Sequence, residues 1–485
     1  MTHRYAVTQR LLGLLVMLFS TTMLIPLVIA LGYADGEAAA FAMSFAITLV
    51  AGFVCWLPVR STQRDLKVHD GFLVVALFWV VLSGFGALPL LFAQVPDMSV
   101  TDAIYESVSG LTTTGATVLV GIDGLPHGIL LWRMLLHFFG GMGVIVLAVA
   151  VLPLLAVGGM QLYRAETPGP IKDAKLTPRI RETAKALWLV YVGLTIACAL
   201  AYWLAGMSVF DAVGHAFSTL STGGFSNHDA SIGYFDSALI EAIAVVFMFL
   251  GAVNFSLHFA AFRRGSLGAY WRDAEFHGWL WLVVGATALC TVVLLTSGYY
   301  SSVGTAVLKA LFQVVSIGST TGFLTADYTQ WPTFIPVMLI LGTVVGGCGG
   351  STSGGIKVSR FLLLIKQGLR ELKRQVHPSA ELPVKFGGRV IPHSVLEAVW
   401  GFFSIYIGIY AFSFLLLIAT GMDEISAFSA VAACLNNTGP GLGEVTFSMA
   451  GIPIAAKWIL CADMLVGRLE IFTLLVVLTP AFWRR

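Results

Sequence analysis

The chain has 485 residues, of which 57% are hydrophobic and 11% are charged, and its formal net charge is +2. Soluble domains carry about 25% charged residues, so the composition excludes an ordinary soluble enzyme, and the small net charge gives no indication of a nucleic-acid partner. The six cysteines lie in apolar segments without C-x-x-C spacing, which favours membrane-core residues over disulfides or metal ligands.

Apolar runs long enough to cross the ~30 Å hydrocarbon core of a bilayer recur along the chain. The first run is longer than the core of a cleaved signal peptide, which predicts a retained span. Ten runs are predicted, at residues 11–31, 38–58, 72–93, 129–156, 186–206, 238–261, 278–297, 333–365 (interrupted), 395–419 and 456–482. The predicted fold class is therefore an all-α integral membrane protein with ten transmembrane helices.

Four shorter apolar stretches lie between these runs, at residues 101–111, 209–220, 304–317 and 425–435. They are too short to span a bilayer and indicate re-entrant or interfacial helices. Lys and Arg gather on one side of the ten-span arrangement, at residues 4–10, 60–67, 164–185, 263–272, 366–389 and 484–485. The positive-inside rule then predicts cytoplasmic termini and places the four short helices at the outer face.

The four short helices are copies of one unit. Each begins with an alanine, and a glycine in a polar loop follows twelve residues later; the pairs are Ala103 and Gly115, Ala212 and Gly224, Ala310 and Gly322, and Ala427 and Gly439. All copies share one orientation, which predicts a pseudo-fourfold axis along the membrane normal and a central pore. Chance matches are the alternative, because Gly and Thr are common in membrane helices, but four matches at one spacing argue against chance.

The repeats divide the chain into five parts. The predicted parts are two leading transmembrane helices (residues 1–68) and four span–pore-loop–span repeats (residues 69–165, 166–265, 266–375 and 376–485). The third repeat also contains a glycine-rich segment inside its second span.

The loops suit a dehydrated cation. Rings of backbone carbonyls replace the water shell of an ion in selectivity filters, and the strained course of such a backbone calls for glycine, which accepts positive φ without steric penalty. The four loops, LTTTGAT, LSTGGFS, GSTTGFL and LNNTGPG, contain no Lys, Arg, Asp or Glu. The sequence therefore predicts selection by neutral carbonyl oxygens rather than by fixed side-chain charge.

These loops, the stretch GGCGGSTSGG and the ending GRLEIFTLL together resemble the pore subunit of Trk-type bacterial potassium uptake systems, in the Trk/Ktr/HKT superfamily. The resemblance covers essentially the whole chain. It implies potassium uptake across the bacterial inner membrane, with K⁺ as the transported ion and no organic cofactor. It also implies a homodimeric pore subunit, and a cytosolic nucleotide-binding regulatory ring (TrkA-like) that docks on basic cytoplasmic loops.

The resemblance implies one filter glycine in each repeat, with K⁺ coordinated by the carbonyls just before it. The corresponding residues are Thr113, Thr114 and Gly115; Thr222, Gly223 and Gly224; Thr320, Thr321 and Gly322; and Asn437, Thr438 and Gly439. Sodium-selective relatives are associated with serine at the first filter glycine, so Gly115 favours potassium.

Acidic residues follow the filter glycines. Asp229, Asp327 and Glu444 each lie five residues beyond the glycine, and the first repeat has Asp123 eight residues beyond. Acids around a pore mouth concentrate cations. Ordinary hydrophilic loop residues are an equal alternative.

The eighth span is interrupted by the ten-residue stretch from Gly346 to Gly355, which includes Gly347, Gly349, Gly350 and Gly354. Each glycine costs about 1 kcal/mol in a helix relative to alanine, so a loop at membrane depth that forms a gate is favoured. Close helix packing is the alternative, but it needs glycines on one helix face, and here they occupy every face.

Arg468 is the only basic residue deep in a predicted span. A central arginine costs about 2.5–3.5 kcal/mol, so it needs partners, and Asp463, Glu470 and the carbonyls of the glycine loop are candidates. The resemblance implies that Arg468 lies in the cavity as an electrostatic barrier of the gate. A structural ion pair is the alternative.

Two other functions compete with ion uptake through a pore. An intramembrane serine protease with Ser351 as nucleophile would need an activating histidine; His137 and His258 are the only candidates within spans, and neither has a supporting motif. A sodium- or proton-coupled cation symporter could use the same loops to bind a coupling ion. The sequence contains no HExxH, P-loop or Rossmann fingerprint.

Overall fold

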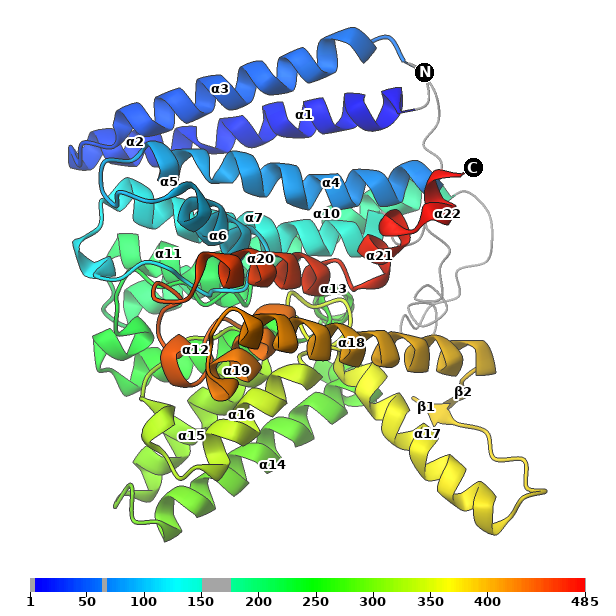
Figure 1. Ribbon diagram of the computed structural model, residues 1–485. Coiled ribbons are helices and arrows are strands. Elements are labelled where there is room, and N and C mark those ends of the chain that lie inside the picture. The colour runs from blue at the N-terminus through cyan, green and yellow to red at the C-terminus, as the bar shows by residue number, and fades with distance from the viewer. Residues whose placement is uncertain (1–4, 63–67, 151–175, 485) are drawn as a thin grey trace.

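The computed structural model describes residues 5–62, 68–150 and 176–484 (Figure 1). The regular secondary structure of the described chain is helical apart from one antiparallel pair of two-residue strands, β1 (Lys385–Phe386) and β2 (Arg389–Val390). The all-α prediction therefore holds, with this small hairpin as an addition in the loop after α17 (Val358–Val376).

The helices follow one another in the order of the predicted repeats. Before and within the first repeat lie α1 (Ala6–Thr22), α2 (Leu24–Tyr33), α3 (Ala38–Trp56), η1 (Leu57–Val59), α4 (Val68–Gly86), α5 (Leu88–Phe92), α6 (Val100–Leu111), η2 (Ile122–Gly124) and α7 (His127–Ala150). The second holds α10 (Leu176–Leu204), α11 (Val209–Leu220), η3 (Ser231–Phe235), α12 (Ala238–Gly251) and α13 (Phe255–Arg264).

The third and fourth repeats continue the series. The third holds η4 (Leu267–Arg272), α14 (Ala274–Thr296), α15 (Val303–Gly318), η5 (Tyr328–Gln330), α16 (Phe334–Val345) and α17 (Val358–Val376). The fourth holds α18 (His393–Ala419), α19 (Glu424–Leu435), η6 (Gly443–Val445), α20 (Ile454–Arg468), α21 (Phe472–Leu478) and α22 (Pro480–Trp483). The four short predicted helices correspond to α6, α11, α15 and α19.

Six helical segments of the described residues are long and apolar enough to cross a membrane, or seven if the bent pair α12 and α13 is one span. The six are Ala6–Tyr33, Ala38–Val59, Asp70–Phe92, Glu182–Leu204, Ala274–Thr296 and His393–Ala419. The chain is thus a multi-pass membrane protein. The count of ten spans stays a prediction, because the remaining predicted runs correspond to broken helices or, at residues 151–156, extend beyond the described chain.

Two runs predicted as continuous spans are broken. Residues 238–261 form α12 and α13, which meet at an angle of 99°. Asn254 begins the second helix, because its side chain accepts a hydrogen bond from the N–H of Ser256 (2.8 Å). Residues 456–482 form α20 and α21, separated by Glu470 and Ile471 with φ of 52° and 55°. Hydropathy alone does not report such breaks.

The hydrophobic core has two large parts. One joins the leading helices to the first and fourth repeats around buried residues such as Trp79 and Trp132. The other joins the second and third repeats around Tyr191, Trp279 and Phe312. Many large apolar side chains remain on the outside of the helices, as expected where the solvent is lipid.

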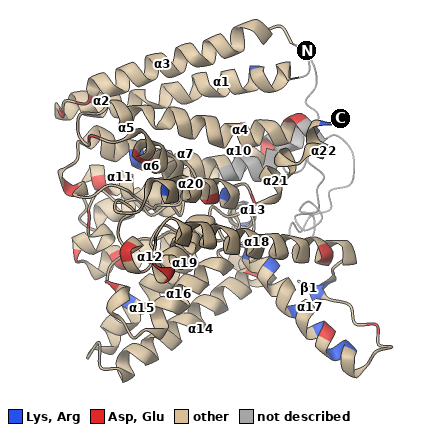
Figure 2. Cartoon of the chain, viewed as in Figure 1, with Lys and Arg blue, Asp and Glu red and all other residues tan. Residues whose placement is uncertain are grey.

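Both termini and the β1–β2 hairpin lie at the same end of the molecule in Figure 1. Figure 2 shows several Lys and Arg residues along α17 at this end. Some of the predicted basic positions (Arg4, Arg64, Lys67, residues 164–175 and Arg485) and the predicted repeat boundary at residues 165/166 lie outside the described residues.

Candidate functional site

The four short helices begin alike. A side chain at each N-cap accepts a hydrogen bond from the backbone N–H three residues later, which satisfies an amide that the helix leaves free. The caps are Ser99, Ser208, Ser302 and Asp423. All four helices then run into the buried centre of the protein and end at the predicted filter loops.

The four helices also end alike. After each helix one residue adopts left-handed φ of 52–57°: Thr113, Thr222, Thr320 and Asn437. The next residue donates its N–H to a carbonyl five residues earlier, at 2.8–2.9 Å in every copy. This is the Schellman type of helix end, which usually employs glycine. The sequence predicted only one residue with positive φ in each loop, the glycine, and did not predict this additional threonine or asparagine.

The filter glycines follow two residues later, with φ of 80–95°. A Cβ atom placed on each glycine would collide with, or press against, a carbonyl oxygen of the next loop. Gly115 faces the oxygen of Gly223, Gly224 that of Thr321, Gly322 that of Thr438, and Gly439 that of Thr114. The order runs from the first loop to the fourth and back to the first. The four loops therefore form a closed ring.

The carbonyls just before the filter glycines have no partner. Among the described residues, no hydrogen bond ends on the carbonyl oxygens of the eight residues concerned, Thr113, Thr114, Thr222, Gly223, Thr320, Thr321, Asn437 and Thr438. All eight residues are buried. Buried carbonyls are normally paired, so the ring holds a set of free oxygen ligands of the kind that a dehydrated cation requires.

The glycine-rich stretch forms a loop directly against this ring. Ser353 donates to the carbonyl of Ser319 (2.7 Å), and the N–H of Gly354 donates to the Thr320 hydroxyl (2.7 Å). Thr352 donates to the carbonyl of Leu220 (2.9 Å). Gly346, Gly350 and Gly355 have φ of 70–74°, so this stretch is not helical. The backbone of Gly354 also packs against the carbonyl of Asn436.

The break between α12 and α13 receives this loop. The N–H of Cys348 donates to the Ala252 carbonyl (2.8 Å), and the N–H of Phe255 donates to the Gly350 carbonyl (3.1 Å). Glu275 holds the loop from the other side by accepting from the N–H of Gly349 (2.8 Å). Gly347 lies close to the Ala252 carbonyl. The loop is thus fixed by both backbone and side-chain contacts to its neighbours.

Arg468 reaches the loop from the end of α20. Its guanidinium donates to the carbonyl of Thr352 (2.8 Å) and to that of Gly140 (3.4 Å). Of the predicted partners, the loop carbonyl is present and the two acids are not. Glu470 pairs with Arg360 (2.6 Å), and Asp463 accepts from Ser413 (2.7 Å). Within the described chain, Arg468 makes no ion pair. The alternative of a structural ion pair with Asp463 or Glu470 is therefore not observed.

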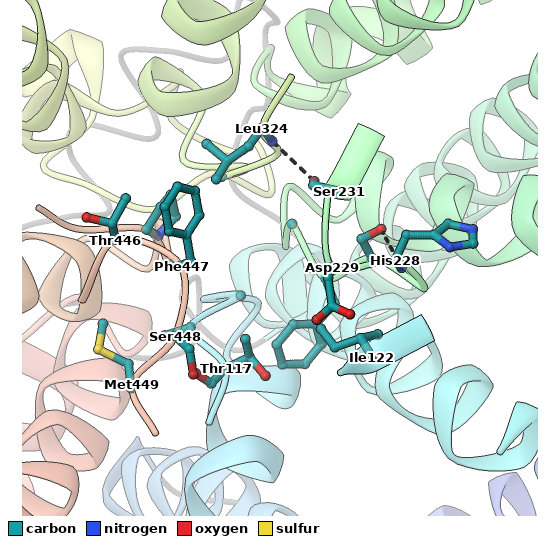
Figure 3. A pocket seen from close by; sticks show the side chains of 18 of the residues that line it. Thr117, Ile122, His228, Asp229, Ser231, Leu324, Thr446, Phe447, Ser448 and Met449 are labelled. Carbon is teal, nitrogen blue, oxygen red and sulfur yellow. Dashed lines mark hydrogen bonds between the residues drawn. The ribbon is translucent and has the colours of Figure 1, made fainter. Parts of the chain in front are cut away.

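A cavity opens on the other side of the ring (Figure 3). The four filter glycines line it, together with residues from the loops that follow them. Of the predicted acidic mouth, only Asp229 lines this cavity. Asp327 instead accepts from the N–H of Thr329 (3.0 Å), and Asp123 is bonded to His228. The proposed ring of four acids is therefore reduced to one acid at the cavity wall.

His228 joins the loops that follow the first two filters. Its Nδ1 lies 2.5 Å from Asp123 Oδ1 and its Nε2 lies 3.5 Å from Asp211 Oδ1. Burial disfavours the charged imidazolium, but the two carboxylates outweigh it and raise the pKa of His228. Burial likewise acts against the charged form of Asp123, and hydrogen bonds from His228 and the Asp229 N–H overcome it and lower its pKa.

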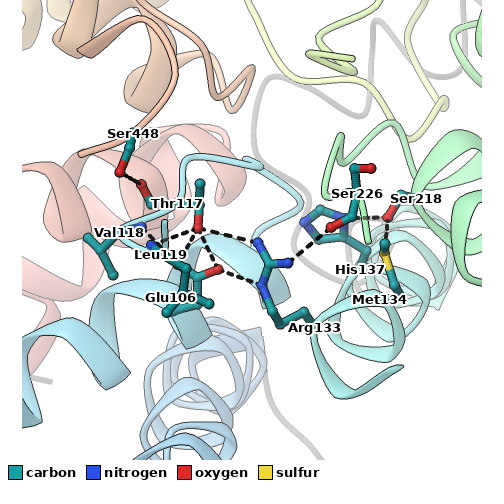
Figure 4. A network of polar contacts seen from close by, with 10 residues as sticks. All are labelled: Glu106, Thr117, Val118, Leu119, Arg133, Met134, His137, Ser218, Ser226 and Ser448. Atoms are coloured by element: carbon teal, nitrogen blue, oxygen red, sulfur yellow. Dashed lines mark hydrogen bonds and ion pairs between the residues drawn. The ribbon is translucent and has the colours of Figure 1, made fainter. Parts of the chain in front are cut away.

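Arg133 and Glu106 form a buried pair behind the first loop (Figure 4). The Arg133 Nε lies 2.7 Å from Glu106 Oε1, and both side chains are almost fully buried. Glu106 accepts from the N–H of Val118 (3.0 Å), and Arg133 donates to the carbonyl of Ser226 (3.1 Å). The pair ties the first loop to the second. Sequence reasoning missed Glu106, although an acid in the middle of a short apolar helix is a signal of a buried partner.

Ser351 has no catalytic arrangement. Its hydroxyl donates to the carbonyl of Cys348 (2.6 Å). His137 contacts Ser218, and His258 contacts Tyr270 and the Leu250 carbonyl. In the described part of the chain neither histidine is bonded to Ser351, so the base that a protease requires is absent there.

Comparison with known proteins agrees with this geometry. The sequence profile of TrkH, described as a cation transport protein, matches residues 37–484. The chain belongs to the TrkH family. The Trk system potassium uptake protein TrkH of Vibrio parahaemolyticus is 57% identical over 98% of this chain and 98% of its own length. The protein of the same name from Escherichia coli is 55% identical over 99% of this chain and 100% of its own length.

A solved structure supports the same assignment. The crystal structure of the potassium transporter TrkH from Vibrio parahaemolyticus matches with a TM-score of 0.93 and 53% sequence identity, covering 99% of this chain and 100% of the other. The TrkH relatives are named as transporters and not as enzymes. These findings confirm the family predicted from the loops and exclude the protease as the function of this chain.

Proposed function

We propose that this TrkH-family protein takes up potassium ions across the bacterial inner membrane through a filter lined by backbone carbonyls. The observation that carries the proposal is the closed ring of four loops, whose eight buried carbonyls lack hydrogen-bond partners among the described residues. A ring without fixed charge selects by the number and field of its oxygen dipoles. The names of the relatives, which are potassium uptake proteins, support K⁺ as the ion.

The glycine loop is proposed as the gate. It lies against the filter loops, and Arg468 holds it through the Thr352 carbonyl. A positive charge in a cavity of low dielectric constant repels a passing cation. In this arrangement both the loop and the guanidinium therefore obstruct the pathway on the cytoplasmic side of the filter.

The larger architecture belongs to the same proposal. It comprises ten spans, two of which lead four pseudo-fourfold pore repeats, with the repeat boundaries given above. Both termini are proposed to be cytoplasmic. The basic residues on α17, which lies at the same end of the molecule as both termini, support this orientation. The protein is proposed to act as a homodimer under a cytosolic nucleotide-binding ring of the TrkA-like type, as part of the Trk system for which the relatives are named.

The test is ion flux through the purified protein in proteoliposomes. K⁺ and Rb⁺ are expected to pass faster than Na⁺ and Li⁺, because the neutral ring replaces the hydration shell of the larger ions at lower cost. Reversal potentials with K⁺, Na⁺ and pH gradients set separately distinguish a channel from a sodium- or proton-coupled symporter. Equal Na⁺ and K⁺ flux through intact protein would refute the proposed selectivity.

A further inference from the structure

The second filter loop lacks a side chain that the other three possess. The residue before the filter glycine is Thr114, Thr321 or Thr438 in those loops and Gly223 in the second. The Thr114 hydroxyl bonds to Thr112 (2.8 Å), and the Thr321 hydroxyl bonds to Ser319 (2.7 Å). In the fourth loop the Thr438 hydroxyl is buried without a hydrogen-bond partner among the described residues, so there the threonine only fills space. Gly223 can neither make the bond to Ser221 nor fill this space.

The side chain of His137 occupies the missing volume. A Cβ atom on Gly223 would collide with Nδ1, Cγ and Cε1 of the imidazole. The ring is completely buried and stacks on Phe225 with centroids 4.2 Å apart, and its Nδ1 lies 3.1 Å from the Ser218 hydroxyl. Figure 4 shows His137 one helical turn along α7 from Arg133, whose guanidinium also lies over the Phe225 ring.

Two other repeats have a different residue at the position of this histidine. Gly140, Gly251 and Gly467 each approach the carbonyl that ends a short helix, at Leu111, Leu220 and Leu435 respectively. These glycines therefore mark equivalent positions in three repeats. Three residues before them stand His137, Met248 and Met464. The only histidine among these three positions lies against the one loop that has no threonine directly before its filter glycine.

We propose that His137 is a specificity-determining positioning residue, which braces the second filter loop from behind in place of the absent threonine side chain. The inference rests on the proposed filter. The carbonyl of Gly223 belongs to the ring of four loops, and glycine has more backbone freedom than any other residue type. Removal of the imidazole would leave a cavity into which the loop can shift, and a shift of that carbonyl alters ion discrimination.

The experiment is a double-mutant cycle between His137→Ala and Gly223→Thr, read as the K⁺/Na⁺ permeability ratio in proteoliposomes. His137→Ala is expected to lower the ratio at least about threefold, and the double variant to return within about twofold of the unmodified protein, as coupling between contacting residues allows. Gly223→Thr alone is expected to fold poorly or lose selectivity, because the threonine collides with the imidazole. Folded protein is quantified by size-exclusion chromatography.

Met248→Ala is the matched control, because it removes a buried side chain at the equivalent position of the second repeat. Gly223→Thr is expected not to rescue it. The inference is overturned if His137→Ala keeps the original ratio, if Gly223→Thr alone folds with the original ratio, or if the double variant misfolds or is merely additive. Absence of K⁺ selectivity in the unmodified protein would instead refute the filter itself, so the two failures are distinguishable.

Discussion

At the scale of single residues, the proposed filter is held by backbone conformations that few residue types accept. Each loop combines a left-handed threonine or asparagine with a left-handed glycine two positions later. Strained backbone of this kind costs about 1–3 kcal/mol per residue and persists only where the surroundings impose it. Here the surroundings are the neighbouring loops, since every filter glycine packs against a carbonyl of the next one.

Gly115→Ser tests this packing. A Cβ at residue 115 collides with the Gly223 carbonyl oxygen and adds strain at φ of +80°, so the carbonyls must move. The K⁺/Na⁺ permeability ratio, measured from bi-ionic reversal potentials, is expected to fall about tenfold, equivalent to ~1.4 kcal/mol. Gly121→Ser is the control, because Gly121 also has positive φ (+69°) but has open space around its Cβ position. An unchanged ratio in folded Gly115→Ser protein would contradict the ring geometry.

At the scale of elements, the sequence predicts helices well and their interruptions poorly. Hydropathy and length located the four short helices, because each is a local apolar run. The 99° break between α12 and α13 was not predicted. Its carbonyl and amide groups bind a loop that lies about a hundred residues later in the chain, and a local pattern contains no information on such a partner.

The same distinction applies to the site. The predicted filter glycines follow from a repeated spacing, and the predicted gate loop follows from its glycine content. Glu106 and His137 contact residues that are far away in sequence, Arg133 and Gly223. Arg468 was expected near either acids or carbonyls, and only the folded chain distinguishes its hydrogen bond to Thr352 from an ion pair.

Arg468 and the glycine loop test the gate as one element. Two unit charges ~8 Å apart at an effective dielectric constant of ~20 repel by ~2 kcal/mol, so Arg468→Ala is expected to raise basal flux by more than about tenfold. Deletion of residues 351–353 removes the Thr352 carbonyl that Arg468 binds and should raise flux similarly. Because both changes open one constriction, their combination should be less than additive.

Lys457→Ala is a suitable control for the gate. Lys457 is also a buried basic residue of α20, but it pairs with Asp102 (2.6 Å). Its loss should lower thermal stability and leave flux per folded molecule unchanged. If Arg468→Ala behaves in the same way, with lower stability and normal unit flux, the gating role of Arg468 is wrong.

At the scale of the whole molecule, each pair of neighbouring predicted repeats is joined by a polar contact. The first and second are joined by Asp123 and His228, the second and third by Glu241 and Lys309, the third and fourth by Tyr328 and the Gly441 carbonyl, and the fourth and first by the Met449 N–H and the Thr117 carbonyl. These contacts close the ring of repeats around the filter, in one chain whose four parts differ in sequence.

The contact between the first and second predicted repeats contains a histidine, His228. His228 faces Asp123 and Asp211, with Asp229 next to it in the chain and the His215 ring 6.2 Å away. Its pKa is raised above the ordinary value of 6.5. The stabilisation is therefore fully present below pH 6.5 and is lost as the pH rises through the raised value.

The thermal stability of the protein in detergent should consequently fall slightly as the pH increases above 6.5, and His228→Gln should remove that part of the slope. Because the Asp123 side chain is 48% exposed, solvent screening limits the effect to about 0.5–1 kcal/mol, or about 1–2 °C in Tm. Asp123→Asn should reduce the same slope, since it removes one of the carboxylates that raise the pKa of His228. His393→Gln is the control, because that imidazole is 71% exposed and contacts Glu397 within its own helix. A slope that persists unchanged in His228→Gln would show that the junction between the first two repeats does not depend on the charge of His228.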